Sequence, residues 1–180
     1  MLLHRRNAIR RAKIHACRLH LQRWLDHCQR DAHIPIAAIA AQAGALISCH
    51  QSFASDVRAD FLRALISISP EGLTRAFLSN SGAEAMEAAL KAVKKNREGA
   101  LVSFEGNFHG RTLGALSVTW GPAIRHPFDP LIPHCAFLPF NGEALLRFAR
   151  ENEIAAVFLE CIQGNSGVYP LPADLAEAVN

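Results

Sequence analysis

One stretch of the chain, FLSNSGAEAMEAALKAVKK at residues 77–95, constrains the fold more than any other. Residues 76–79 are predicted to end a buried strand, residues 80–82 to form a turn, and residues 83–95 to form a helix rich in Ala, Glu, Leu and Lys. Ser81 and Glu84 have the spacing of a capping box, whose hydroxyl and carboxylate accept hydrogen bonds from free amides at the helix start. The sequence therefore predicts a strand, a glycine turn and a capped helix in direct succession.

This helix start has features of an anion-binding site. Gly82 leaves room for a ligand to approach the backbone, and the free N–H groups and the helix dipole favour negative charge, so a phosphate would suit the position. The alternative is a well-capped helix without a ligand, since the chain contains neither a GxGxxG pattern nor a P-loop. Local physical chemistry alone favours this alternative.

Helical and strand-like segments alternate along the rest of the chain. Helical spacing of apolar residues occurs in three segments, at residues 35–47, 53–68 and 143–151. Three short apolar runs predict strands, at residues 100–104, 135–138 and 154–159. Four prolines between residues 121 and 133 predict an irregular surface loop. Helices placed between buried strands imply an α/β fold with a mostly parallel sheet that is flanked by helices on both faces.

Three turns with polar or glycine residues directly follow predicted strands. Their residues are Asn80, Ser81 and Gly82 in the first turn, Phe108, His109, Gly110 and Arg111 in the second, and Glu160 and Gln163 in the third. In open α/β sheets, ligands bind at the carboxyl ends of the strands. We therefore expect one ligand site where the three turns meet.

Residues 1–33 differ in composition from the remainder. The first 30 residues contain eight Lys or Arg and only one acidic residue, Asp26, whereas the whole chain has a net charge of only +3. A basic amphipathic helix of this kind could be an organelle presequence, a membrane-surface helix or a nucleic-acid contact. The segment lacks serine and has a single aromatic residue, Trp24, which disfavours a presequence and a nucleic-acid contact. A solvated extension or a mis-assigned start is the preferred interpretation, so we expect neither a nucleic-acid nor a membrane partner.

The cysteines indicate the cellular compartment. There are five, an odd number, with no CxxC spacing and no His partner at metal-ligand spacing. This pattern indicates reduced thiols in a cytoplasmic protein and predicts no metal site. No apolar run is long enough to cross a bilayer, and an apolar content of 50% is sufficient for a globular core.

Three motifs together resemble a known enzyme family. They are SNSGAEAMEAALK at residues 79–91, FEGNFHGRTLGALSVTWGPAIRHPFDPL at residues 104–131 and FLECIQGNSGV at residues 158–168. In this order and spacing they resemble the class III pyridoxal-phosphate aminotransferases, and most of all the acetylornithine aminotransferase branch. The run around residues 117–131 is most similar to enzymes that act on carrier-protein-bound lysine or ornithine.

The resemblance extends from about Ile34 to the C-terminus. It implies that residues 34–180 are an incomplete large domain of fold type I, the aspartate-aminotransferase-like fold, and that residues 1–33 are a separate basic segment. It further implies a cytoplasmic homodimer in arginine or lysine biosynthesis. The parent reaction would transfer an amino group between an acetylornithine-, ornithine- or lysine-type donor and 2-oxoglutarate, giving glutamate, with an amino-group carrier protein as a possible further partner.

The resemblance also assigns roles to individual residues. Six of them would form the pyridoxal 5'-phosphate site: Ser81, Gly82, Ala83, Phe108, Glu160 and Gln163. The amides of Gly82 and Ala83 would bind the phosphate, and Phe108 would stack on the pyridine ring. Arg111 would bind a substrate carboxylate, for which a guanidinium fork is well shaped; a surface arginine is the alternative. His109 is expected to be a structural neighbour of the ring.

Some positions depart from the family pattern. The third motif is usually LEPIQGEGG, whereas this chain has Cys161 in place of the proline, Asn165 in place of the second glutamate and Ser166 in place of a glycine. In related enzymes that glutamate neutralises an arginine when one of the two substrates is absent. The change therefore affects how the site would handle two different substrates.

The chain has only four lysines: Lys13, Lys91, Lys94 and Lys95. Transamination needs a Schiff-base lysine that also moves a proton, and an acidic residue that keeps the pyridine nitrogen protonated. None of the four lysines has the required position, so we expect this chain to contain the front part of the cofactor domain and to be inactive alone. The alternative is a non-catalytic truncated paralogue that associates with a full-length aminotransferase.

Overall fold

The computed structural model describes residues 33–50 and 52–180. The chain divides into two compact units, residues 1–73 and residues 74–180. The basic segment predicted at residues 1–33 lies outside the described residues, except for its last residue. Within the described part, no helix is long and apolar enough to span a membrane.

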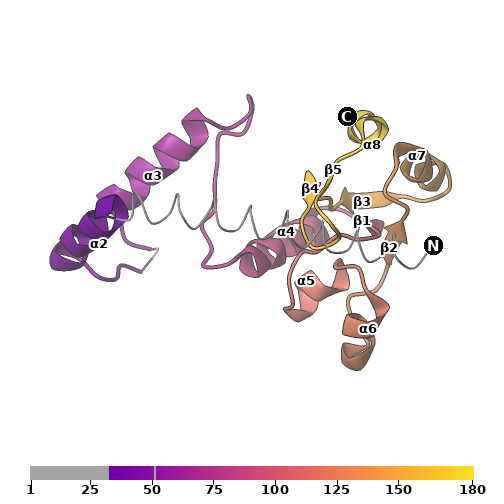
Figure 1. The fold of residues 1–180 in the computed structure, drawn as a ribbon, viewed down its shortest axis with the longest axis horizontal. Coiled ribbons are helices and arrows are strands. Elements are labelled where there is room, and N and C mark those ends of the chain that lie inside the picture. Colours follow the sequence, from indigo (N-terminus) through magenta and orange to yellow (C-terminus); the bar gives the residue numbers. More distant parts are fainter. Residues whose placement is uncertain (1–32, 51) are drawn as a thin grey trace, which may run out of the picture. The chain divides into compact units, whose positions relative to one another are not determined.

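The described part of the first unit contains two helices, α2 (His33–Ala45) and α3 (Asp56–Ser67), shown in indigo and purple in Figure 1. They confirm the helices predicted at residues 35–47 and 53–68, with shifted ends. Ser55 caps α3, since its hydroxyl accepts a hydrogen bond from the Arg58 amide at 3.5 Å. None of the residues of α3 is fully buried, and its apolar residues are partly or fully exposed.

The second unit is built on a parallel sheet with the strand order β2-β1-β3 (Figure 1). The strands are β1 (Ala100–Phe104), β2 (Cys135–Leu138) and β3 (Ile154–Val157). All three were predicted, although β3 ends two residues earlier than expected. Strand β1 lies in the centre, where its last four residues are buried. The α/β class with a parallel sheet is confirmed.

Helices cover both faces of this sheet. On one face, Leu101 of β1 packs in a cluster with Leu90 of helix α4 (Gly82–Asn96). On the other face, Val102 packs with Leu145 of α7 (Gly142–Glu151) and Leu175 of α8 (Ala173–Val179). Successive residues of β1 alternate between the two clusters, because side chains of a strand point to opposite faces in turn.

The predicted irregular loop at residues 121–133 is partly wrong. Two short helical segments occupy it, α6 (Pro122–Arg125) and the 3-10 helix η1 (His126–Phe128). Each has a proline in its first turn, where the missing N–H costs no hydrogen bond, so proline starts these turns instead of excluding helix. Four further short elements were not predicted: α5 (Leu113–Ser117), β4 (Ile162–Gln163), β5 (Tyr169–Pro170) and helix α8.

The buried strand predicted at residues 76–79 is also wrong. This segment has no strand pairing within the described chain, and the side chains of Phe77 and Leu78 are 69% and 40% exposed. A strand exists only where a neighbouring strand accepts its hydrogen bonds, and the described sheet places none beside this segment. The apolar run preceding Ser79 is therefore exposed and has no regular secondary structure.

Candidate functional site

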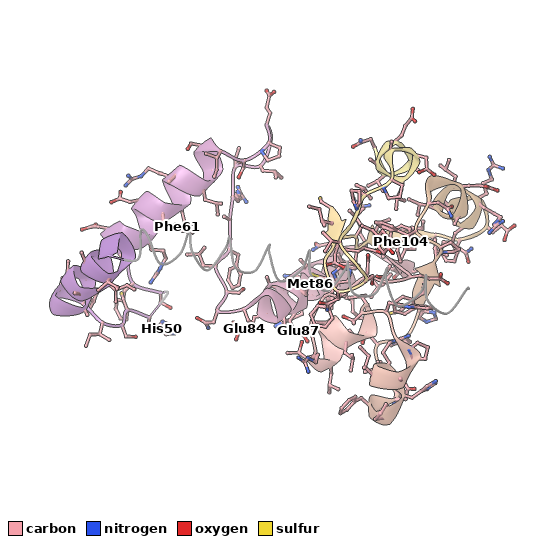
Figure 2. All side chains as sticks on the ribbon, in the orientation of Figure 1. His50, Phe61, Glu84, Met86, Glu87 and Phe104 are labelled. Carbon is pink, nitrogen blue, oxygen red and sulfur yellow. The ribbon has the colours of Figure 1, made fainter. Side chains whose placement is uncertain are left out.

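Helix α4 begins with the predicted serine cap, but its glutamate binds a different amide than a capping box would. The Ser81 hydroxyl accepts a hydrogen bond from the Glu84 amide at 3.2 Å. In return, the Glu84 carboxylate accepts one from the Asn80 amide at 2.8 Å. A standard capping box would use the amide of the capping residue itself, so the carboxylate reaches one residue further back than predicted. Glu84 therefore fixes the turn that leads into the helix (Figure 2).

The first amides of α4 are open to a ligand. Among the described residues, no group accepts a hydrogen bond from the N–H of Gly82 or Ala83. A Cβ atom placed on Gly82 would have no heavy atom within 4 Å. Two adjacent donors with free space beside them, at the positive end of a helix of 15 residues, suit the oxygen atoms of a phosphate.

The turn after β1 packs directly against this helix start. Gly110 has a φ of 130°, and a Cβ atom added to it would lie 2.8 Å from the Ala83 Cβ. Only glycine allows so close an approach in this backbone conformation. The structure thus brings the turn at residues 108–111 and the start of α4 together. This contact was expected from the prediction that these turns meet at one edge of the sheet.

Asn107, a residue that the sequence did not single out, connects the turns after β1 and β3. Its side chain is 1% exposed. Its amide nitrogen donates to the Phe158 carbonyl at 3.1 Å, and its amide oxygen accepts from the Gln163 side chain at 2.8 Å. The same Gln163 nitrogen donates to the Glu105 carbonyl at 2.8 Å, so both of its hydrogens are used inside the protein. The contact of Gln163 with a cofactor stays a prediction.

Glu160 makes a second connection between these turns. Its carboxylate accepts a hydrogen bond from the Phe108 amide at 2.8 Å. This bond fixes the backbone at the aromatic residue that is expected to face the pyridine ring. Glu160 could therefore support a cofactor through Phe108 without touching it, and its assignment to the cofactor site also stays a prediction.

Phe108 and Arg111 line one cavity of about 340 Å³. The other lining residues are Gly106, Asn107, Trp120, Ile124, Asn165 and Ser166. Arg111 is exposed and forms no hydrogen bond or ion pair with any described residue. None of the described lining residues carries a carboxylate, and the cavity combines the Arg111 guanidinium with aromatic and aliphatic side chains. Such a lining suits a ligand with a carboxylate group on a short carbon chain. Ser81, Gly82, Ala83, Glu160 and Gln163 do not line it.

His109 is half-buried next to the cavity. Its amide donates to the Thr119 hydroxyl at 2.9 Å, and its ring lies edge-on to the Phe158 ring at 6.2 Å. Burial lowers the pKa of the His109 imidazole below 6.5, although the nearby Glu160 carboxylate acts in the opposite direction. These contacts agree with the structural role that we expect for this histidine.

The three described lysines lie on α4, in the half of the helix that is further from Gly82. Lys91 is nine residues after Gly82, roughly 13 Å further along the axis at 1.5 Å per residue, and Lys94 and Lys95 lie in the last turn. Lys13 lies outside the described residues. No group of three or more His, Cys, Asp or Glu side chains within the described part could hold a metal ion.

Comparisons with known proteins identify the relatives of this arrangement. The family model described as aminotransferase class-III matches residues 31–180. The acetylornithine aminotransferase of Methanopyrus kandleri is 37% identical over 80% of this chain and 36% of its own length. The [LysW]-aminoadipate semialdehyde transaminase of Deinococcus radiodurans is 41% identical over 85% of this chain and 36% of its own length.

A solved structure shows the same fold. The ornithine aminotransferase of Toxoplasma gondii superposes with a TM-score of 0.71 and 29% identity, over 80% of this chain and 36% of that protein. Its crystal structure contains pyridoxal phosphate at partial occupancy in the active site. The present chain thus spans little more than a third of the length of the relatives that it matches.

Proposed function

The chain belongs to the class-III aminotransferase family, and we propose that it forms the front part of the cofactor domain of such an enzyme. The enzyme would transfer an amino group between an acetylornithine-, ornithine- or lysine-type donor and 2-oxoglutarate. One observation carries this proposal: the open amides of Gly82 and Ala83 and the cavity that contains Phe108 and Arg111 adjoin through the contact of Gly110 with Ala83.

The described residues fit the phosphate of pyridoxal phosphate. The Gly82 and Ala83 amides have no acceptor among the described residues, so a phosphate would not need to displace an existing hydrogen bond there, and a Cβ atom on Gly82 would meet no heavy atom within 4 Å. Phe108 is half-buried and lines the adjoining cavity, as a residue that stacks on a planar ring must. When bound, pyridoxal phosphate supplies an electron sink for reactions at the carbon that carries the amino group.

Arg111 would orient the substrate by its carboxylate. None of the described residues that line the cavity is acidic, so the guanidinium has no competing carboxylate there, and Asn165 and Ser166 offer further polar contacts. The relatives that act on [LysW]-linked semialdehydes support the finer proposal that the donor is attached to a carrier protein. A homodimer in the cytoplasm is the expected setting of the complete enzyme.

The 180-residue chain should bind cofactor without transaminating. We propose this because the three lysines that the structure describes lie toward the far end of α4, away from a cofactor bound at Gly82. Purified chain should bind pyridoxamine 5'-phosphate, an amine form that cannot react with surface lysines, and should bind unphosphorylated pyridoxamine much more weakly. Chain mixed with pyridoxal phosphate, N-acetylornithine and 2-oxoglutarate should produce no glutamate above a cofactor-only control. Equal binding of the two amines would refute the cofactor site, and clear turnover would refute the predicted inactivity.

A further inference from the structure

The side chain of Glu87 joins helix α4 to the segment that follows Arg111. One oxygen of its carboxylate accepts three hydrogen bonds: from the Thr112 hydroxyl at 2.6 Å, from the Gly114 amide at 2.9 Å and from the Ala115 amide at 3.3 Å. Figure 2 shows Glu87 on α4, one turn beyond Glu84. We infer that Glu87 is a positioning residue, which holds Arg111 at a fixed place relative to the start of α4.

Two glycines show how closely the segment is fitted to the helix. A Cβ atom on Gly114 would collide with the Glu87 carboxylate, and one on Gly110 would collide with the Ala83 side chain. Ala83 and Glu87 are four residues apart, so they lie on the same face of α4 in successive turns. The segment is therefore attached to the helix at two points, one before and one after Arg111.

Arg111 depends on its backbone for its position. Thr119 also supports this backbone, since its hydroxyl accepts a hydrogen bond from the His109 amide and donates one to the Gly110 carbonyl. The Arg111 side chain is exposed and has no hydrogen-bond or ion-pair partner in the described part of the chain. Its position is set by its backbone, which the Gly110 contact and the Glu87 hydrogen bonds fix on either side. This inference rests on the proposed function, in which Arg111 binds a carboxylate. A segment whose backbone is fixed before binding favours tighter binding, since less conformational freedom is lost when the ligand binds.

The test measures the binding affinities of two ligands, 2-oxoglutarate and pyridoxamine 5'-phosphate, separately on the full chain. Trp24→Phe leaves Trp120, which lines the cavity beside Arg111, as the single tryptophan and thus as a fluorescent reporter of 2-oxoglutarate binding. Pyridoxamine 5'-phosphate binding reports on the start of α4. In this background, Glu87→Ala should weaken 2-oxoglutarate binding by about tenfold, the effect expected when the segment that carries Arg111 must be ordered on binding. Its effect on pyridoxamine 5'-phosphate affinity should stay within about twofold.

Two further variants sharpen the result. Glu87→Gln keeps an oxygen that can accept from Thr112 and Gly114, so it should restore part of the lost 2-oxoglutarate affinity. The matched control is Glu143→Ala on α7, which removes an exposed glutamate without a hydrogen-bond partner among the described residues and should change neither affinity. If Glu87→Ala does not fold, Thr112→Val removes one of the three hydrogen bonds and should weaken 2-oxoglutarate binding by about threefold.

Three outcomes would overturn the inference. Equal losses for both ligands would mean that Glu87 only stabilises the fold, and unchanged 2-oxoglutarate affinity would mean that it does not position Arg111. If the unsubstituted chain binds neither ligand, the proposed function itself fails, and the role of Glu87 with it. A loss confined to 2-oxoglutarate, with partial rescue by Glu87→Gln, supports the inference.

Discussion

Replacing Gly82 by proline tests the phosphate site by removing one hydrogen-bond donor and little else. Gly82 is the first residue of α4, where proline is well tolerated, and its N–H has no acceptor to lose among the described residues. The preceding residue, Ser81, has φ −151° and ψ 160°, an extended conformation that is compatible with a following proline. The helix should therefore form normally in this variant.

The expected loss of affinity follows from one hydrogen bond to a charged group. Such a bond contributes about 1.5–3 kcal/mol, and each 1.4 kcal/mol corresponds to a factor of ten in affinity. Gly82→Pro should thus weaken pyridoxamine 5'-phosphate binding by about ten- to a hundredfold. Gly82→Ala keeps the N–H and adds a methyl group into open space, so it should bind like the unsubstituted chain.

Fluorescence titration of both variants decides the question. Pyridoxamine without phosphate serves as the second ligand, and its affinity should be the same in all three proteins. Circular dichroism should show equal helix content and equal melting temperatures within a few degrees. A folded Gly82→Pro variant that binds pyridoxamine 5'-phosphate as tightly as Gly82→Ala would refute the assignment of the phosphate to these amides.

Three further predictions address the surroundings of the site. Gly110→Ala should lower the free energy of unfolding, measured by urea denaturation, by about 1–3 kcal/mol, because of backbone strain at φ 130° and the collision with Ala83. Adding Ala83→Gly should recover only the part of this loss that is due to the collision. Asn107→Ala should cost about 1–3 kcal/mol, since the Gln163 amide loses an acceptor in a buried site, while a stability unchanged within 0.5 kcal/mol (about the error of the method) would contradict this. The pKa of His109, followed by NMR, should lie below 6.5, and because the unfolded chain then takes up the proton first, its contribution to stability should fall as the pH drops below about 6.5.

The sheet was predictable where the pattern of residues reflects burial on both faces. Strand β1 is the central strand, so its side chains must be apolar or form hydrogen bonds within the protein. Its apolar run predicted the strand at its full length, residues 100–104. The segment that ends at Ser79 has a similar apolar pattern but no neighbouring strand in the described sheet. The amino-acid composition of a segment indicates whether it can be buried, whereas its pairing into a sheet depends on which other strands are present.

The site was predictable only in part for a related reason. Phe108 and Arg111 could be placed at one edge because the carboxyl ends of parallel strands meet there. Asn107 and Glu87 could not, since their hydrogen-bond partners lie 51 and 27 residues away along the chain. A buried asparagine next to a glycine turn, and a glutamate on the second turn of a helix, have no local pattern that distinguishes them from ordinary turn and surface residues.

Helix α4 accounts for the relation between the two halves of the proposed site. Its first turn offers the open amides, and its second turn carries the carboxylate that fixes the segment after Arg111. The groups proposed to bind the phosphate and the substrate carboxylate are thus both positioned by helix α4. This helix is anchored by Leu90, which is buried against the central strand. A site built in this way keeps its spacing when the surrounding loops move, because the hydrogen bonds of the helix set the distance between its turns. The same geometry explains why glycine suits residue 110, which has a φ of 130° and lies directly against Ala83, and why a side chain at residue 114 would displace the Glu87 carboxylate.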